Sequence, residues 1–251
     1  GLDSSILAGI IHDHNHVNGH FPTFTASFPE HPLDETRYVD CLNRKYPFTN
    51  HRAFPTAQSA FDHFHQFVYA IDEPAADATF YTQYEVMRLA KQHGITVLLD
   101  GQGGDENFAG YQYFHGFYLY GLLNKMRLGK LTGELFKVLF RRQDRSAFQT
   151  LAFQILPDRI KQRLLLKSVP YVSDTFFDKY VHSSLIYNEF FNATDLHTSL
   201  VRHFQYKLEH LLRMEDRSSM AFSIEARVPY LDNRLVEYVL GVTDDIKINS
   251  G

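Results

Sequence analysis

Cysteine is almost absent from the sequence, since Cys41 is the only one among 251 residues. A single cysteine forms neither an internal disulfide nor a thiolate metal cluster, so we expect a reducing compartment, with the cytoplasm as the simplest location. Long apolar runs are also missing, and none approaches the roughly 20 residues that a membrane span needs. The formal net charge of -4 gives no long-range attraction for nucleic acid or an anionic membrane. We therefore expect a soluble protein with neither kind of partner.

Other familiar features are missing too. The sequence has no Gly-x-x-x-x-Gly-Lys-Ser/Thr phosphate loop, no internal repeat and no low-complexity linker. No methionine or secretory signal precedes Gly1, and the last residues resemble an unfinished strand or loop. We interpret the chain as a fragment and expect a strand just before Gly1, because a Gly-Leu-Asp-Ser-Ser turn that leads into an apolar helix normally follows one.

Strand-like and helix-like patterns alternate over the first part of the chain. The strand-like runs are residues 23–28, 48–54 and 96–100. Apolar residues at helical spacing separate these runs, which predicts an α/β fold with a doubly wound parallel sheet. Farther along, helical spacing dominates, so we predict a nucleotide-binding α/β lobe over residues 1–120 and an all-helical lobe over residues 121–251. One aromatic cluster is interpreted as core packing rather than a platform for bases: Tyr111, Tyr113, Phe114, Phe117, Tyr118 and Tyr120.

The most distinctive stretch follows the apolar run at residues 96–100. There the chain continues as Gly101-Gln102-Gly103-Gly104-Asp105-Glu106, which predicts a buried strand that ends in a tight loop, with a helix beginning near Asp105. In an open α/β sheet, ligands bind outside the carboxyl ends of the strands, where glycines let backbone amides approach them. This loop is therefore the expected active site, although a plain strand-to-helix turn would have the same composition.

A second turn, Gly1-Leu2-Asp3-Ser4-Ser5, has the features of a phosphate cradle. Free amides at a helix N-terminus, the hydroxyls of Ser4 and Ser5, and a magnesium ion held by Asp3 would suit a phosphate group. An ordinary Asp or Ser N-cap is the alternative. Taken together, the two turns present Asp3 and Asp105 toward one crevice, which favours a magnesium-bound polyphosphate over a zinc or redox centre.

A third cluster lies near the end of the chain. It reads Glu215-Asp216-Arg217-Ser218-Ser219-Met220-Ala221, then Glu225-Ala226-Arg227-Val228-Pro229-Tyr230-Leu231-Asp232. Arginines that alternate with acids are suited to gripping a carboxylate or phosphate at two points. A surface helix with ion pairs, ended by Pro229, is the alternative interpretation.

These motifs resemble a known family. Gly-Leu-Asp-Ser-Ser resembles the tail of the Ser-Gly-Gly-x-Asp-Ser pyrophosphate loop of N-type ATP pyrophosphatases, and Asp100 to Tyr111 resembles the second signature of the synthetase domain of asparagine synthetases. The run from Leu212 to Asp232 is similar to a third signature of that family. The three blocks occur in order and at compatible spacing over nearly the whole chain.

The resemblance implies an adenine nucleotide alpha hydrolase-like fold and a ligase that uses ATP and Mg²⁺. In such enzymes the side-chain carboxylate of aspartate attacks the α-phosphate, pyrophosphate leaves, and ammonia derived from glutamine displaces AMP from the acyl adenylate. The implied magnesium ligands are Asp3 and Asp105. The implied ATP-binding residues are Gly1, Leu2, Asp3, Ser4, Ser5, Ala26, Asp100 and Gly101. The implied substrate-binding residues are Asp72, Arg217, Glu225 and Arg227. A glutaminase domain is expected in the full-length chain, and a homodimer is compatible with the resemblance.

One departure from the family concerns Gln102, which stands where many members have a catalytic glutamate. An amide cannot act as a general base, so the proton acceptor lies elsewhere or the chemistry differs. Two alternatives therefore stay open: an amidotransferase or cyclising synthetase that acts on another acid, as in polysaccharide-modifying or β-lactam synthetase relatives, or a nucleotide-binding module without catalysis. The leading Ser-Gly of the pyrophosphate loop and the lysine that the family places shortly after Gly251 are both absent, so we expect the chain as given to be inactive or badly impaired.

Overall fold

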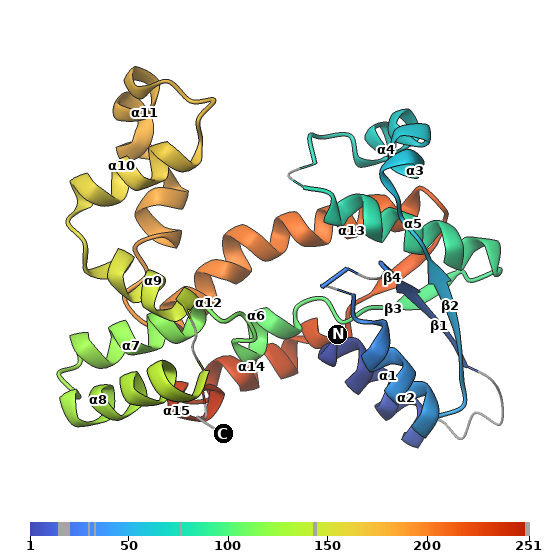
Figure 1. Cartoon of the computed structure of the whole chain (residues 1–251), viewed down its shortest axis with the longest axis horizontal. Helices are drawn as coiled ribbons and strands as arrows, with labels where there is room; N and C mark the ends of the chain where they lie inside the picture. The colour runs from blue at the N-terminus through green and yellow to red at the C-terminus, as the bar shows by residue number, and fades with distance from the viewer. Residues whose placement is uncertain (15–20, 30, 33, 76, 143–144, 249–251) are drawn as a thin grey trace. The chain divides into compact units, whose positions relative to one another are not determined.

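The computed structural model describes residues 1–14, 21–29, 31–32, 34–75, 77–142 and 145–248, and its helices and strands appear in Figure 1. The chain divides into two compact units. The first comprises Gly1–Gln102 and His210–Asp232, and the second comprises Gly103–Glu209 and Asn233–Gly251. The predicted boundary at residue 120 does not coincide with this division, because a late segment of the chain packs with the first unit.

The first unit contains all four strands of the described residues. In chain order its elements are α1 (Leu2–His14), β1 (Phe21–Ala26), α2 (Thr36–Lys45), β2 (Phe48–Ala53), α3 (Ala57–Asp62), α4 (Phe64–Ile71), α5 (Thr79–Gln92), β3 (Val97–Leu99), most of α13 (Glu209–Met220), β4 (Glu225–Arg227) and the 3-10 turn η5 (Pro229–Leu231). The three strands predicted from sequence patterns are confirmed to within two residues at their ends, but β3 is not buried as predicted, because Val97 and Leu99 are exposed.

The strands form two separate parallel pairs. β1 pairs with β2 in the register Phe21 with Phe48 through Ala26 with Ala53, and β3 pairs with β4 in the register Val97 with Glu225. The prediction of parallel strands is therefore confirmed, whereas the prediction of one doubly wound sheet is not. The missed strand, β4, has three residues and a partner more than a hundred residues away, so no local alternation marks it.

Helix α5 packs against both β1 and β2. Its buried residues Met87 and Ala90 share a core cluster with Ile224, and Phe24 of β1 and Leu98 of β3 pack against that cluster. A second cluster joins α4, α5 and α13 through Phe67, Phe80, Tyr84 and Met214, among others. The same helix thus carries apolar contacts to both strand pairs.

The described part of the second unit is entirely helical outside its turns. Its elements are α6 (Gly104–Phe108), α7 (Phe114–Asn124), α8 (Leu128–Lys137), the π-helical η1 (Val138–Arg142), α9 (Arg145–Ile155), α10 (Asp158–Ser168), α11 (Asp174–Tyr180), the 3-10 turn η2 (Val181–Ser183), the π-helical η3 (Ile186–Phe190), α12 (Leu196–His203), the π-helical η4 (Phe204–Leu208), α14 (Asn233–Gly241) and α15 (Asp244–Lys247). The prediction of helical structure in the later part of the chain is confirmed, apart from β4.

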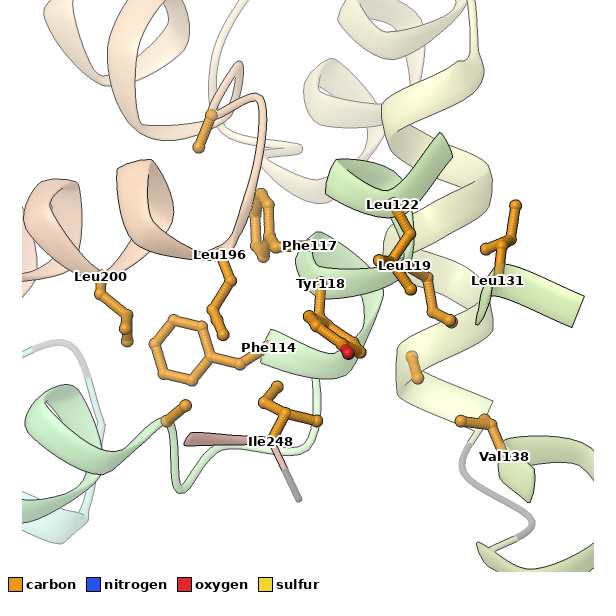
Figure 2. Packing of buried hydrophobic residues seen from close by; sticks show 13 residues of the cluster. Phe114, Phe117, Tyr118, Leu119, Leu122, Leu131, Val138, Leu196, Leu200 and Ile248 are labelled. Carbon is orange, nitrogen blue, oxygen red and sulfur yellow. The ribbon is translucent and has the colours of Figure 1, made fainter. Parts of the chain in front are cut away.

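One continuous apolar core holds the second unit together, and Figure 2 shows how its side chains interlock. Phe114, Phe117, Tyr118 and Leu119 of α7 are buried at its centre. Leu196 and Leu200 of α12, Leu131 of α8 and Ile248 pack around them. The predicted structural role of these α7 aromatics is confirmed. In the described residues, no helix has the length and apolar character to cross a membrane.

Candidate functional site

A cavity of about 580 Å³ lies in the first unit, between α1, β1 and β3. Four of the predicted site residues line it: Ser4, Ser5, Asp100 and Arg227. They come from three separate stretches of the chain: the first turn of α1, the end of β3 and the end of β4. Because parallel strands place their carboxyl ends at one edge, the structure collects these side chains where an α/β protein binds its ligand.

The turns after β3 and before α1 touch each other through Gly101. A Cβ atom at position 101 would lie 3.0 Å from the backbone nitrogen of Ser4 and 3.1 Å from the Cβ of Asp3. Such contacts are tighter than normal, so a side chain at position 101 would require the start of α1 to shift by a few tenths of an ångström. The prediction that these two glycine-rich turns share one crevice is supported within the first unit by this contact.

The first turn of α1 is held in place from two sides. The hydroxyls of Ser4 and Ser5 donate to the Gly1 carbonyl oxygen at 3.2 and 2.8 Å. The buried Tyr230 hydroxyl donates to the Asp3 carbonyl oxygen at 3.1 Å. Burial, and then the nearby Asp3 carboxylate, raise the pKa of Tyr230. Tyr230 therefore fixes the main chain that carries Asp3, which is itself half-buried.

Glu215 of α13 is the most unusual carboxyl group of the first unit. It is 2 % exposed, and its carboxyl group lies within hydrogen-bonding reach of the Asp100 carboxyl group. Burial is the main cause that raises its pKa, and the carboxylates of Asp100 and Asp216 add to the effect. Asp100 accepts a hydrogen bond from the Gly101 backbone amide, so Glu215 lies beside the turn that follows β3.

The predicted substrate-binding residues are all in ion pairs, and all except the half-buried Arg217 are exposed. Arg217 forms an ion pair with Asp72 at 3.6 Å and donates to the Ile71 carbonyl oxygen. Asp72 has a side chain that is 82 % exposed. Glu225 and Arg227 pair within β4 at 2.8 Å. These ion pairs agree with the simpler interpretation of the third sequence cluster, and only Arg227 of the four residues lines the cavity.

Six more predicted residues of the first unit are not among those that line this cavity: Gly1, Leu2, Asp3, Ala26, Gly101 and Gln102. Ala26 is the last residue of β1, next to Thr25, which does line it. Leu2 is exposed at the start of α1, and Gln102 is half-buried after Gly101. Their predicted roles stay predictions.

The second unit holds Asp105 in the first turn of α6. A Cβ at Gly110 would overlap the Asp105 carboxyl oxygen, so the carboxylate lies directly over that glycine. The neighbouring Glu106 is buried and accepts a hydrogen bond from the Tyr111 hydroxyl at 2.8 Å. The side chain of Lys207 covers the Tyr111 ring, with its Nζ 3.6 Å from the ring centroid. Asp105 thus belongs to a tightly packed polar cluster.

A directed chain of hydrogen bonds extends from Lys207. Its Nζ donates to the Tyr113 hydroxyl at 3.2 Å, and that hydroxyl lies 2.9 Å from Nε2 of His203. Nδ1 of His203 lies 2.7 Å from the Ser199 carbonyl oxygen, which can only accept, so Nδ1 carries the proton and Nε2 accepts from Tyr113. Burial lowers the pKa of His203 to about 4, which keeps the imidazole neutral near pH 7.

The donor set fits a magnesium ion that arrives with a nucleotide. Among the described residues, no group of three or more His, Cys, Asp or Glu side chains is arranged to hold a metal. Mg²⁺ is usually held by one or two carboxylates together with substrate phosphates, so Asp3 and Asp105 each have the chemistry of a magnesium ligand. Asp3 belongs to the first unit and Asp105 to the second, and their sharing of one ion stays a prediction.

Sequence reasoning missed several residues of these clusters. Tyr230 was part of a recognised motif but had no assigned role, and its bond to Asp3 joins positions 227 residues apart. Glu215 has the sequence surroundings of a surface ion-pair helix. Lys207 and His203 occur in a stretch whose only local signal is helical spacing. Such contacts depend on tertiary packing, which no short-range pattern encodes.

Comparison with known proteins gives a consistent result. The family model described as asparagine synthase matches residues 1–251. Asparagine synthetase [glutamine-hydrolyzing] 3 of Bacillus subtilis (strain 168) is 25% identical over 262 residues, which cover 99% of this chain and 39% of that protein. Asparagine synthetase [glutamine-hydrolyzing] 1 of the same organism is 25% identical over 270 residues, covering 100% of this chain and 40% of that protein. A putative asparagine synthetase [glutamine-hydrolyzing] 2 of Methanocaldococcus jannaschii is 28% identical over 126 residues, covering 50% of this chain and 24% of that protein. The chain thus spans about two fifths of the length of the two Bacillus relatives.

Proposed function

The chain belongs to the asparagine synthase family, and from this premise we propose that it is the ligase part of an enzyme that adenylylates the side-chain carboxylate of aspartate or a related acid. ATP supplies the adenylyl group and pyrophosphate leaves. Ammonia then attacks the acyl adenylate and releases AMP with an amide. The ammonia comes from glutamine, hydrolysed by a glutaminase domain elsewhere in a longer protein. A cytoplasmic location and a homodimer are part of the same proposal.

The observation that carries this proposal is the cavity of the first unit. Ser4 and Ser5 from the turn at the start of α1, Asp100 from the turn after β3 and Arg227 from the third motif line one space of about 580 Å³. Gly101 brings the backbones of the two turns into contact. Hydroxyls, helix-start amides and a guanidinium suit phosphate and carboxylate groups, which are the two kinds of group that this reaction joins.

The chain's own residues contribute mainly by position and charge. Gly1, Leu2, Ser4 and Ser5 would surround the pyrophosphate, and Ala26, Asp100 and Gly101 would border the adenosine. Asp3 and Asp105 would hold Mg²⁺, which when bound neutralises charge on the phosphates. Arg217, Arg227, Asp72 and Glu225 would orient the acid. No enzyme nucleophile is needed, because positioning and charge neutralisation lower the barrier of such a phosphoryl-centred step.

The same cavity also concerns how the two strand pairs are arranged relative to one sheet. The cavity's apolar lining comes from residues such as Leu7, Phe21, Val86 and Leu98, on α1, β1, α5 and β3. We propose that the apolar part of this space, between β1 and β3, takes a further strand that joins the two pairs into one doubly wound sheet, and that the polar part, at Ser4, Ser5, Asp100 and Arg227, takes the ligand. The shared packing of both pairs on α5 supports this arrangement. A longer version of the protein that keeps β1 and β3 in separate sheets would contradict it.

Pyrophosphate exchange tests the function. Full-length protein is incubated with Mg-ATP, labelled pyrophosphate and one acid at a time. We expect label to enter ATP when aspartate is present. Exchange with another acid alone would support the alternative of a different acceptor, which the amide side chain of Gln102 favours, since the usual glutamate is replaced. Nucleotide binding without exchange for any acid would support the non-catalytic alternative and reject the ligase.

A further inference from the structure

A separate cavity of about 490 Å³ lies within the second unit. Its walls come from α7 and the residue before it, α9, α10, the end of η3, and the stretch from the end of α12 into η4. A volume of this size is usual for small-molecule sites, which range from about 300 to 1,000 Å³. Of the described residues, none lines both this cavity and that of the first unit.

Aromatic rings form most of the cavity wall. The ring centroids of Phe190 and His203 are 4.5 Å apart, and those of Phe153 and Phe191 are 6.3 Å apart. Aromatic pairs attract each other at such distances, so a planar ring placed in the cavity finds faces and edges to pack against. The rings that line the cavity are Tyr113, Phe117, Phe153, Phe190, Phe191 and His203.

The wall is held in place by the packing around it. Phe117 belongs to the continuous apolar core shown in Figure 2. Gln154, which is 4 % exposed, donates from Nε2 to the Phe191 carbonyl oxygen at 3.0 Å and so ties α9 to the end of η3. His203 is held at both ring nitrogens by the hydrogen bonds described above. A preformed cavity of this kind has little ordering cost on binding.

Lys207 gives this wall a positive charge. Among the described residues that line the cavity it is the only Lys or Arg, and none is Asp or Glu. His203 adds no charge near neutral pH, since its pKa is about 4. Burial lowers the pKa of Lys207, but the carboxylates of Asp105 and Glu106, which do not line the cavity, oppose that effect and favour the cation. An anion is the complementary ligand.

Lys207 also has hydrogen-bond donors available. Its Nζ carries three N–H groups, and the bonds of the described residues use one of them, to the Tyr113 hydroxyl at 3.2 Å. The residue lies in the π-helical turn η4, and such turns are rare and frequent at functional sites. The Tyr111 ring, 3.6 Å from Nζ, restrains the side chain further. The ammonium group is therefore positioned before a ligand arrives.

We propose that this cavity binds a small aromatic carboxylic acid, with its ring among the aromatic side chains and its carboxylate on Lys207. Charge-assisted hydrogen bonds from the lysine suit a carboxylate. A phosphorylated ligand is disfavoured, because it would bring about two negative charges to a single lysine. The inference goes beyond the proposed function and does not depend on it, since none of these contacts involves ATP or the acid that is adenylylated.

Three probes separate the contribution of the ring from that of the charge. Phenylacetate has both features, phenylacetamide keeps the ring and a carbonyl oxygen without the charge, and acetate keeps the charge without the ring. Each is titrated into the full-length protein by isothermal titration calorimetry at neutral pH and equal ionic strength. We expect phenylacetate to bind at least about tenfold more tightly than either of the others. Equal affinities for phenylacetate and phenylacetamide, or no binding of any probe, would overturn the proposal.

A substitution of the lysine tests where the acid binds. In Lys207→Gln the affinity for phenylacetate should fall about tenfold or more, while that for phenylacetamide changes less than about threefold. Lys167→Gln, on the exposed side of α10, is the matched control for loss of one positive charge and should change neither affinity. Unchanged phenylacetate binding in Lys207→Gln would place the acid in another site and refute the assignment.

A second variant decides the question if Lys207→Gln does not fold. Gln149 lines the cavity from α9 and is exposed, so Gln149→Glu adds a negative charge there without disturbing buried packing. Phenylacetate should then bind about fivefold more weakly, whereas phenylacetamide should bind as before. The same affinity change for both probes, or no change for either, would contradict an anion in this cavity.

Discussion

The two units differ in how they bury apolar surface. The second unit has one cluster of thirteen buried residues that joins helices from α7 to the segment after α15. The first unit divides its buried residues between two smaller clusters and encloses a cavity of about 580 Å³. The first unit therefore has its apolar contacts in separate groups beside a cavity, whereas the second has one continuous core, with cavities of about 490 and 540 Å³ at its margins. Substitutions that test this difference should affect stability in one unit and nucleotide binding in the other.

The largest effect is expected from Asp105→Ala. If this carboxylate binds magnesium, its loss should reduce magnesium-dependent pyrophosphate exchange by about a thousandfold. Asp174→Ala, an exposed carboxylate at the start of α11 in the same unit, should leave exchange unchanged. Retained activity in Asp105→Ala would remove this residue from the site and confine the chemistry to the first unit.

A contrast of two phenylalanines measures the packing difference. Phe114 is fully buried in the second unit, and Phe114→Ala should lower the free energy of unfolding by about 3–5 kcal/mol. Phe61 of the first unit is 79 % exposed, and Phe61→Ala should cost less than about 0.5 kcal/mol. Urea unfolding measures both. Similar losses would mean that Phe61 is covered in the folded protein and that the comparison is wrong.

The buried imidazole makes the second unit sensitive to acid. The pKa of His203 is about 4 in the folded state and roughly 6.5 when unfolded. Protons therefore bind preferentially to the unfolded chain between these values, so stability from this group is complete above about pH 6.5 and is lost toward pH 4. The shift corresponds to roughly 3 kcal/mol. Unfolding measured at pH 7 and pH 4.5 should show a smaller difference in His203→Gln than in the unaltered protein. An identical pH dependence of stability in the two proteins would disprove the assignment of the low pKa to His203.

A smaller effect is expected at the contact between the two turns of the first unit. Gly101→Ala would place a methyl group 3.0 Å from the Ser4 nitrogen, and ATP affinity should fall about tenfold as the turns separate. Gly133→Ala, in α8 with no atom within 4 Å of its added methyl, should leave ATP binding unchanged and gain up to about 1 kcal/mol of stability. Isothermal titration with ATP distinguishes the two. Unchanged affinity in Gly101→Ala would place the nucleotide elsewhere.

The smallest effect on stability is expected from Arg227→Ala. Its ion pair with Glu225 is exposed, so unfolding should change by less than about 0.5 kcal/mol. Because Arg227 lines the cavity, the KM for the acid should nevertheless rise about tenfold. Arg163→Ala, on the exposed side of α10, is the control for loss of one positive charge. A KM that changes equally in both variants would show only a general charge effect.

The parts that the sequence predicted correctly are those with strong local patterns. Alternation and a following proline located β1, and glycines located the end of β3. Helical spacing and dense aromatics predicted the core around Phe114. The division into two sheets was not predicted, because pairing depends on partners far away in the chain. For the same reason β4, a Glu-Ala-Arg triplet with no alternation, was missed.

In the candidate site, too, residues with a local sequence pattern were predicted and residues that depend on tertiary packing were not. Ser4, Ser5, Asp100 and Arg227 were chosen from motifs, and the cavity brings them together. Glu215 was recognised only as part of a charged run, because its burial arises from the packing of α13 and from Asp100. That Asp3 and Asp105 share one magnesium ion stays a proposal, because the two residues belong to different units.

Gly110 carries a consequence for how this loop tolerates change. The obstacle to a side chain there is the carboxyl group of Asp105, not the backbone angle of Gly110. Any larger residue would have to displace the very oxygen atoms that we assign to the metal. Variants with progressively larger side chains at position 110 would thus displace the Asp105 carboxylate by increasing amounts. The metal dependence of activity, measured across this series, would report how closely the reaction depends on the position of that carboxylate.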